Sequence, residues 1–217
     1  MSLLSEKDRN YLKNEFKKLD RSVKLIVFTQ ENECQYCRET RQLSEELAQL
    51  SPKIGTEIVT FAPEGEVAKQ YGIDKIPAIV LVEDGPQPLD YGIRFYGIPS
   101  GYEFGTLVEG IQMVSAVDSG FPSEIKHKVA QIDKPVHMQV FITPTCPYCP
   151  QAVHLAHQMA MENPNVRADM VEAIEFPHLS NKYHVMGVPR TVINEKYHLE
   201  GAAPGAMVLN KIAEALA

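Results

Sequence analysis

The chain has 217 residues, of which 44% are hydrophobic and 23% charged, the balance of a globular protein that can bury a core. Its net charge of −7 disfavours nucleic acid and anionic membranes as partners, because both attract basic surfaces. Residues 1–18 carry several charges and no apolar signal-peptide core, so we expect a cytoplasmic protein without membrane attachment.

The first half of the sequence alternates between helical and strand patterns. Ser5 and Asp8 resemble a capping box, and apolar residues at helical spacing predict an amphipathic helix over 5–20. The apolar, β-branched run 23–29 predicts a buried strand that leads to Cys34 and a long helix. Further predictions are strands at 57–61, 78–82 and 91–96, and helices at 64–71 and 100–117.

The second half repeats this pattern after a break at residues 119–122. A helix is predicted at 123–132 and a strand at 136–143, followed by Cys146 and another long helix. The same 112 residues separate three matched pairs: Cys34 and Cys146, Tyr71 and Tyr183, and Pro77 and Pro189. After the prolines the first unit has eight extra residues, which we assign to a longer hairpin loop around 84–89.

All four cysteines belong to C-x-x-C pairs, Cys34 with Cys37 and Cys146 with Cys149. A cysteine at a helix amino terminus meets free backbone N–H groups and the positive end of the helix dipole, which favour the thiolate. The first cysteine of each pair is therefore the predicted nucleophile, and the second resolves the mixed disulfide that the first forms. No further cofactor is expected beyond these redox-active disulfides.

The residues between the cysteines differ, and so we predict that the two sites differ in reduction potential. Pro147 suits the first turn of a helix and stiffens the second pair relative to Gln35 in the first. Tyr36 and Tyr148 either contact substrate or simply cover the sites.

Each cysteine pair has a matching proline 43 residues beyond its first cysteine, Pro77 and Pro189. A cis bond before such a proline would expose the backbone of Ile76 or Val188 beside the thiols. That backbone can pair with an extended polypeptide substrate. We therefore expect these residues to form substrate-binding segments.

Two C-x-x-C pairs can also hold zinc if they meet in space. Structural zinc pairs usually sit on short knuckles, whereas each pair here heads a long helix and has its own proline. Redox chemistry is the favoured interpretation, with no metal expected.

The Cys-Pro-Tyr-Cys pair, followed by a strand that begins Val188-Pro189, resembles the glutaredoxin branch of the thioredoxin superfamily. The tandem arrangement resembles the protein disulfide oxidoreductases of thermophilic archaea and bacteria. The resemblance implies an α/β fold of two tandem thioredoxin-like units, 1–119 and 120–217. Each would be a mixed four-stranded sheet flanked by helices, with an added amino-terminal helix and a cis-proline.

The resemblance also implies reduction, oxidation and isomerisation of disulfides in protein substrates, with reduction by a flavoprotein of the thioredoxin-reductase type. Two alternatives remain open: an electron-transfer module between a flavin-dependent reductase and a peroxidase, and a zinc-stabilised structural protein. Glu57 and Asp169, which the repeat matches to each other, are candidate proton acceptors near the thiols, with surface carboxylates as the alternative.

Overall fold

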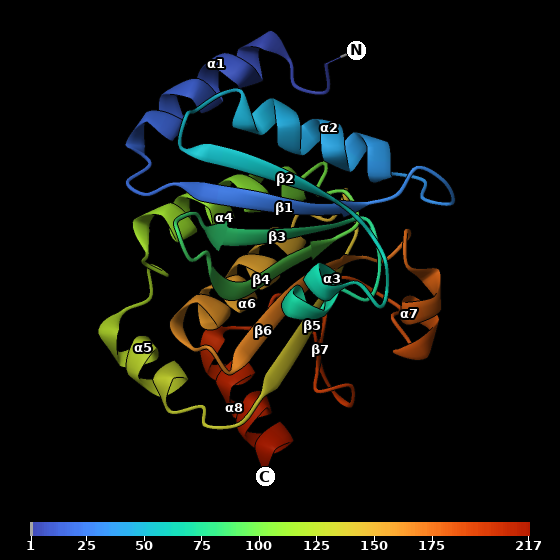
Figure 1. Cartoon of the computed structure of the whole chain (residues 1–217). Helices are drawn as coiled ribbons and strands as arrows, with labels where there is room; N and C mark the ends of the chain where they lie inside the picture. Colours follow the sequence, from blue (N-terminus) through green and yellow to red (C-terminus); the bar gives the residue numbers. More distant parts are fainter. Residues whose placement is uncertain (1) are drawn as a thin grey trace.

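The computed structural model describes residues 2–217 (Figure 1). The first half of the chain contains α1 (Glu6–Glu15), the 3-10 turn η1 (Phe16–Lys18), β1 (Val23–Thr29), α2 (Cys37–Ala48), β2 (Ile54–Thr60), α3 (Glu66–Tyr71), β3 (Ala78–Glu83), β4 (Leu89–Tyr96) and α4 (Glu103–Ala116). The second half contains α5 (Ser123–Ala130), β5 (Val136–Ile142), α6 (Cys149–Glu162), β6 (Val166–Glu172), α7 (Pro177–Lys182), β7 (Arg190–Ile193), β8 (Tyr197–Glu200) and α8 (Gly205–Leu216).

The first helix begins as its capping residues predict. The Ser5 hydroxyl accepts a hydrogen bond from the Asp8 backbone N–H and so satisfies one of the free donors of the first turn. The helix then tightens into a 3-10 turn at Phe16, so the α-helix is shorter than the predicted 5–20. Phe16 is buried there and joins the core beneath the sheet.

Each unit contributes a mixed four-stranded sheet, which confirms the predicted fold. In the first unit β1 is parallel to β2 and antiparallel to β3, and β3 is antiparallel to β4. The second unit repeats this arrangement with β5, β6, β7 and β8. The two sheets are continuous, because β4 pairs in parallel with β6 and gives the strand order β2-β1-β3-β4-β6-β5-β7-β8.

The hairpin that differs between the units corrects one prediction. The strands β3 and β4 have six and eight residues, whereas β7 and β8 have four each, so six of the eight extra residues lengthen strands. Only two residues are added to the turn. The longer strands accommodate their extra length through a register shift between Leu81 and Val82.

The helices cover the sheet unequally. One face packs against α1, α2, α4, α5, α6 and α8 through a large apolar core. The other face carries the short helices α3 and α7 over a smaller core. Figure 1 shows α3 in front of the sheet and α4 and α6 behind it. Residues 117–122 link α4 to α5, and the predicted boundary between units 1–119 and 120–217 stays a prediction, since one sheet runs through both.

The contact between β4 and β6 requires a glycine. Gly92 has φ of +79°, and a Cβ atom there would lie 2.6 Å from the backbone oxygen of Val166 at the start of β6. We expect Gly92→Ala to lower the free energy of unfolding by at least about 2 kcal/mol, through backbone strain and displacement of β6. Urea unfolding measures the loss.

The matched control is Gly85→Ala, because no atom lies within 4 Å of the position that its Cβ would take. Equal stability of the two variants would contradict this account of the β4–β6 contact.

Candidate active site

Both cysteine pairs form disulfides, Cys34 with Cys37 and Cys146 with Cys149, and each pair has a Cα–Cα distance of 5.5 Å. The second cysteine is the first residue of its helix, α2 or α6, and is buried at 2% or 0% exposure. The first cysteine precedes the helix and is more accessible, at 9% for Cys146 and half-buried for Cys34. This is the arrangement of an attacking and a resolving thiol.

Backbone groups border the sulfur atoms at both sites. The Gln30 N–H lies 3.4 Å from Cys37 Sγ, and Cys146 Sγ lies 3.7 Å from the Val188 carbonyl oxygen. The Ile76–Pro77 and Val188–Pro189 peptide bonds are both cis, as the resemblance implies. Val188 therefore lies beside its disulfide, and Ile76 precedes the strand β3, which pairs with the β1 strand that leads to Cys34.

The residues between the cysteines lie outside the helices. Pro147 comes before α6 begins, so the prediction that it occupies the first helical turn is wrong, and Pro150 takes that place. Tyr148 is 68% exposed, whereas Tyr36 is half-buried. Whether either tyrosine contacts substrate or covers its site stays a prediction.

The first site opens onto a polar cavity of about 570 Å³. Its lining includes Cys34, Cys37, Glu31, Arg38, Arg41 and Glu45. The repeat matches the two arginines to Pro150 and Val153 in the second unit, where Val153 is buried in the core. The helix that follows the second cysteine pair packs against α4. The two sites thus share a motif but differ in their surroundings.

The predicted proton acceptors lie on the wrong face of the sheet for contact with the thiols. Glu57 is paired with Ile26 across the strands β1 and β2, so the two side chains share a face of the sheet. Asp169 lies two residues before Val171 on β6 and therefore shares its face. Ile26 and Val171 both pack on the side of α3 and α7. The helices with Cys37 and Cys149 cover the other side. Glu57 is exposed and lies 3.7 Å from Lys24, whereas Asp169 is fully buried.

Asp169 is held by His137 and Arg167 instead. Burial alone would raise the pKa of this carboxyl, but hydrogen bonds and ion pairs with His137 and Arg167 outweigh burial and hold the pKa below its usual range. The residue is therefore a buried member of a polar network between the units, and a role as proton acceptor has no geometric support.

A different carboxyl, Glu103, lies on the face that carries Cys149. It is the first residue of α4, and the preceding Tyr102 donates its N–H to the Pro144 oxygen, two residues before Cys146. Glu103 is fully buried, and burial raises its pKa to about 7, although the neighbouring Thr106 hydroxyl acts in the opposite sense. An acid with this pKa can exchange a proton near neutral pH.

Glu103 was missed because its helix, α4, packs against a helix of the other unit. The sequence held one signal, since Glu103 shares a helical face with Leu107 and Ile111, which are buried. A carboxyl on the apolar face of a helix is a candidate for an altered pKa.

No metal site emerges in the part of the chain that the structure describes. Residues 2–217 contain no group of three or more His, Cys, Asp or Glu side chains that could hold a metal ion. Within the same residues, no helix has the length and apolar character needed to cross a membrane.

The chain is similar in sequence to known redox proteins. Residues 136–214 match a family model described as a thioredoxin domain. The alkyl hydroperoxide reductase AhpF of Pseudomonas putida is 27% identical over 175 residues, which are 81% of this chain and 31% of that protein. A Bacillus subtilis protein named NADH dehydrogenase is 27% identical over 170 residues, or 78% and 30%. The chain spans about a third of the length of the curated relatives it matches.

Solved structures resemble the whole chain. A structure of the alkyl hydroperoxide reductase AhpF from Enterococcus faecalis matches with a TM-score of 0.87 and 29% identity over 99% of each chain. A protein disulfide oxidoreductase from Aeropyrum pernix matches with a TM-score of 0.87 and 29% identity, over 97% of this chain and 93% of that one. The chain therefore has a tandem thioredoxin fold with two C-x-x-C disulfides.

The raised pKa of Glu103 makes a prediction about stability. An acid whose pKa rises from about 4.5 to about 7 on folding binds more protons in the folded state between these values, so its contribution to stability falls as pH rises through this window. At pH 8 this costs up to about 3 kcal/mol relative to pH 4. Glu103→Gln cannot ionise and should lose less stability between pH 4 and pH 8 than the oxidised wild type.

Urea unfolding of the oxidised proteins at both pH values measures this difference. Glu64→Gln is the control, because Glu64 is 89% exposed. Parallel pH dependence of the wild type and Glu103→Gln would refute the assignment.

Proposed function

We propose that the chain is a protein thiol–disulfide oxidoreductase. The observation that carries the proposal is that the first cysteine of each pair is more exposed than the second at a helix start, with the Val188 backbone oxygen 3.7 Å from Cys146 Sγ. The tandem fold shared with a protein named for disulfide oxidoreduction supports it. Substrates would be polypeptide disulfides that align along the residues before Pro77 and Pro189.

Reduction of a substrate proceeds in two exchanges. The Cys146 thiolate attacks one sulfur of the substrate disulfide, which forms a mixed disulfide and releases the other substrate sulfur as a thiolate. Cys149 then loses its proton to solvent, and its thiolate attacks Cys146 Sγ. This releases the second substrate sulfur, and two electrons have passed to the substrate. Cys34 and Cys37 perform the same exchanges at the first site.

The oxidised protein needs a donor of two electrons to complete a cycle. A flavoprotein reductase that supplies a dithiol fits this need. The relatives named as alkyl hydroperoxide reductase AhpF support a reductase of this kind as the electron donor. The proposal includes a cytoplasmic location, where such reductants operate, and no cofactor beyond the two disulfides.

A second function rests on the same relatives. Because their name refers to a peroxide-reducing system, the chain would pass electrons from a flavin-dependent reductase to a peroxidase. A dedicated relay of this kind would reduce one partner and would be a poor catalyst of insulin reduction by dithiothreitol.

Insulin reduction by dithiothreitol distinguishes the two functions. We expect the wild type to accelerate it at least tenfold over dithiothreitol alone, because either site can accept an extended polypeptide. The variant with all four cysteines replaced by serine should be inactive. A wild type no faster than that variant would exclude the general oxidoreductase.

The different surroundings of the two sites predict different potentials. One site has charged side chains at its cavity, and the other packs beneath α4 with a buried carboxyl. Redox titrations against glutathione of Cys34→Ser/Cys37→Ser and Cys146→Ser/Cys149→Ser should differ by at least about 30 mV, which is tenfold in the equilibrium constant. Coincident titration curves would contradict this.

A further inference from the structure

The loop of residues 72–77, called here the site-1 loop, links α3 to β3 and ends with Ile76 and Pro77 of the first site. It starts at Gly72, which has φ of +63° and ends the helix in the left-handed conformation. Its position places it beside β4, the strand that pairs with the second unit. The loop is therefore open to contact from outside its own unit.

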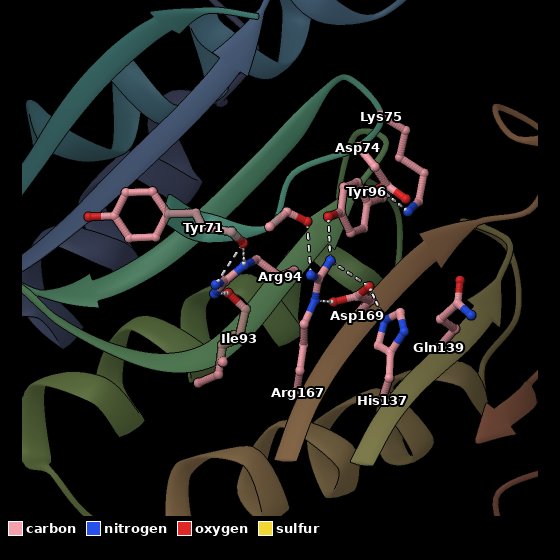
Figure 2. Close-up of polar contacts among 12 residues, drawn as sticks. Tyr71, Asp74, Lys75, Ile93, Arg94, Tyr96, His137, Gln139, Arg167 and Asp169 are labelled. Carbon is pink, nitrogen blue, oxygen red and sulfur yellow. Dashed lines mark hydrogen bonds and ion pairs between the residues drawn. The ribbon is translucent and has the colours of Figure 1, made fainter. Parts of the chain in front are cut away.

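Arg167 of β6 makes that contact (Figure 2). Its Nη1 donates to the Gly72 carbonyl oxygen at 2.8 Å, and its Nη2 donates to the Tyr96 hydroxyl oxygen at 2.6 Å. Arg167 therefore joins the second unit to Gly72, the first residue of the loop that carries Ile76 in the first unit. A Cβ atom on residue 72 would lie 2.6 Å from Arg167 Nη1, so glycine also leaves room for the guanidinium.

The guanidinium is itself fixed in place. Arg167 Nε donates to Asp169 Oδ1 at 2.9 Å, and Asp169 Oδ2 lies 2.6 Å from His137 Nε2. Asp169 is fully buried, and the Arg167 side chain is 27% exposed. A planar guanidinium held by a carboxylate on one edge can present its remaining N–H groups in a fixed direction.

The middle of the loop is held at the same place. Lys75 Nζ lies 3.8 Å from the centroid of the Tyr96 ring, and the Lys75 side chain is only 11% exposed. The hydroxyl of the same ring accepts from Arg167. Tyr96 thus connects the second unit to the loop at a second point, one residue before Ile76.

Among residues 2–217, no side chain of the first unit makes a matching hydrogen bond to the corresponding loop of the second unit. The repeat matches Arg167 to Gly55, which lies on β2 at the far edge of the sheet, and Gly72 to His184. The matching loop begins after Tyr183, whose hydroxyl donates to Glu195 of its own unit. The support of the site-1 loop by the other unit is therefore particular to the first site.

We propose that Arg167, held by Asp169, is a positioning residue that orients the site-1 loop for polypeptide disulfides at Cys34. The proposal rests on the proposed function, because it assigns the loop to substrate alignment. Small disulfides that make no backbone contacts with Ile76 should not depend on it.

The test uses full-length chains with one active site each. Cys146→Ser/Cys149→Ser leaves the first site, and Cys34→Ser/Cys37→Ser leaves the second. Arg167→Met is added to each background, and the pre-reduced proteins are mixed with excess insulin or 2-hydroxyethyl disulfide. The oxidation of each protein is followed by quenching with an alkylating reagent. Rates measured over a range of disulfide concentrations give the half-saturating concentration and the limiting rate separately.

We expect Arg167→Met to raise the half-saturating concentration of insulin at least fivefold at the first site. The limiting rate should change less than twofold, and the rate with 2-hydroxyethyl disulfide should stay the same. The second site should be unaffected with either substrate. Arg21→Met is the control, because Arg21 also forms an ion pair in the first unit, with Glu83, and should change neither substrate.

Two more conservative variants test the proposal in case Arg167→Met does not fold. Arg167→Lys keeps a cation beside Asp169 without the planar fork, and Tyr96→Phe removes only the hydroxyl that Arg167 contacts. Each variant should raise the half-saturating concentration of insulin about twofold to threefold at the first site. The proposal is overturned if neither does, or if all variants slow both substrates or both sites equally. A first site inactive toward both disulfides before any Arg167 change would instead refute the proposed function there, and the positioning role with it.

Discussion

The parallel pairing of β4 with β6 is the contact on which the rest of the structure depends. It joins two similar four-stranded sheets into one and turns two sheet edges into interior strands. Backbone must approach backbone closely along this line, and Gly92 and Gly97 have positive φ values where a Cβ atom would meet the second unit. Charged groups buried along the same line need partners, which Arg167 and Asp169 provide for each other.

The same contact makes the second site a joint product of both units. It brings α4 of the first unit onto α6 of the second, so a carboxyl of one unit is buried on the side of the sheet where the cysteines of the other lie. The packing of α6 against β4 also leaves His157 of α6 fully buried against Phe95, where burial lowers its pKa to about 3. The core between the units thus holds a neutral histidine and an acid with a pKa near neutrality. The helix of the first site, α2, instead contacts the amino-terminal segment and α1 through Glu46 and borders a polar cavity.

The sequence predicted what is local or repeated. Strand 23–29, the four cysteines and the two prolines follow from apolar runs and from a constant spacing, and the structure places them as expected. The β4–β6 pairing could not be predicted, because β4 and β6 are not consecutive and no pattern along the chain encodes their register. The repeat matched Glu57 with Asp169 correctly, but a match in sequence does not show which face of a sheet a residue occupies relative to a helix. Glu103 was missed for the complementary reason, since α4 packs against α6 of the other unit and its burial could not be read from the repeat.

The asymmetry of the two sites follows from how repeated units join. The repeat makes β4 equivalent to β8 and β2 equivalent to β6, so the line of contact joins different edges of the two units. Such a head-to-tail contact cannot treat two copies alike, whereas a two-fold contact would. The first unit contributes β4 to the contact, which places its site-1 loop next to Arg167. The second unit contributes β6, and its helix α6 packs against α4 of the first unit. Two nearly identical motifs therefore acquire different electrostatic surroundings from packing alone. A difference in thiolate stabilisation of about 1.4 kcal/mol is enough to shift a two-electron potential by about 30 mV.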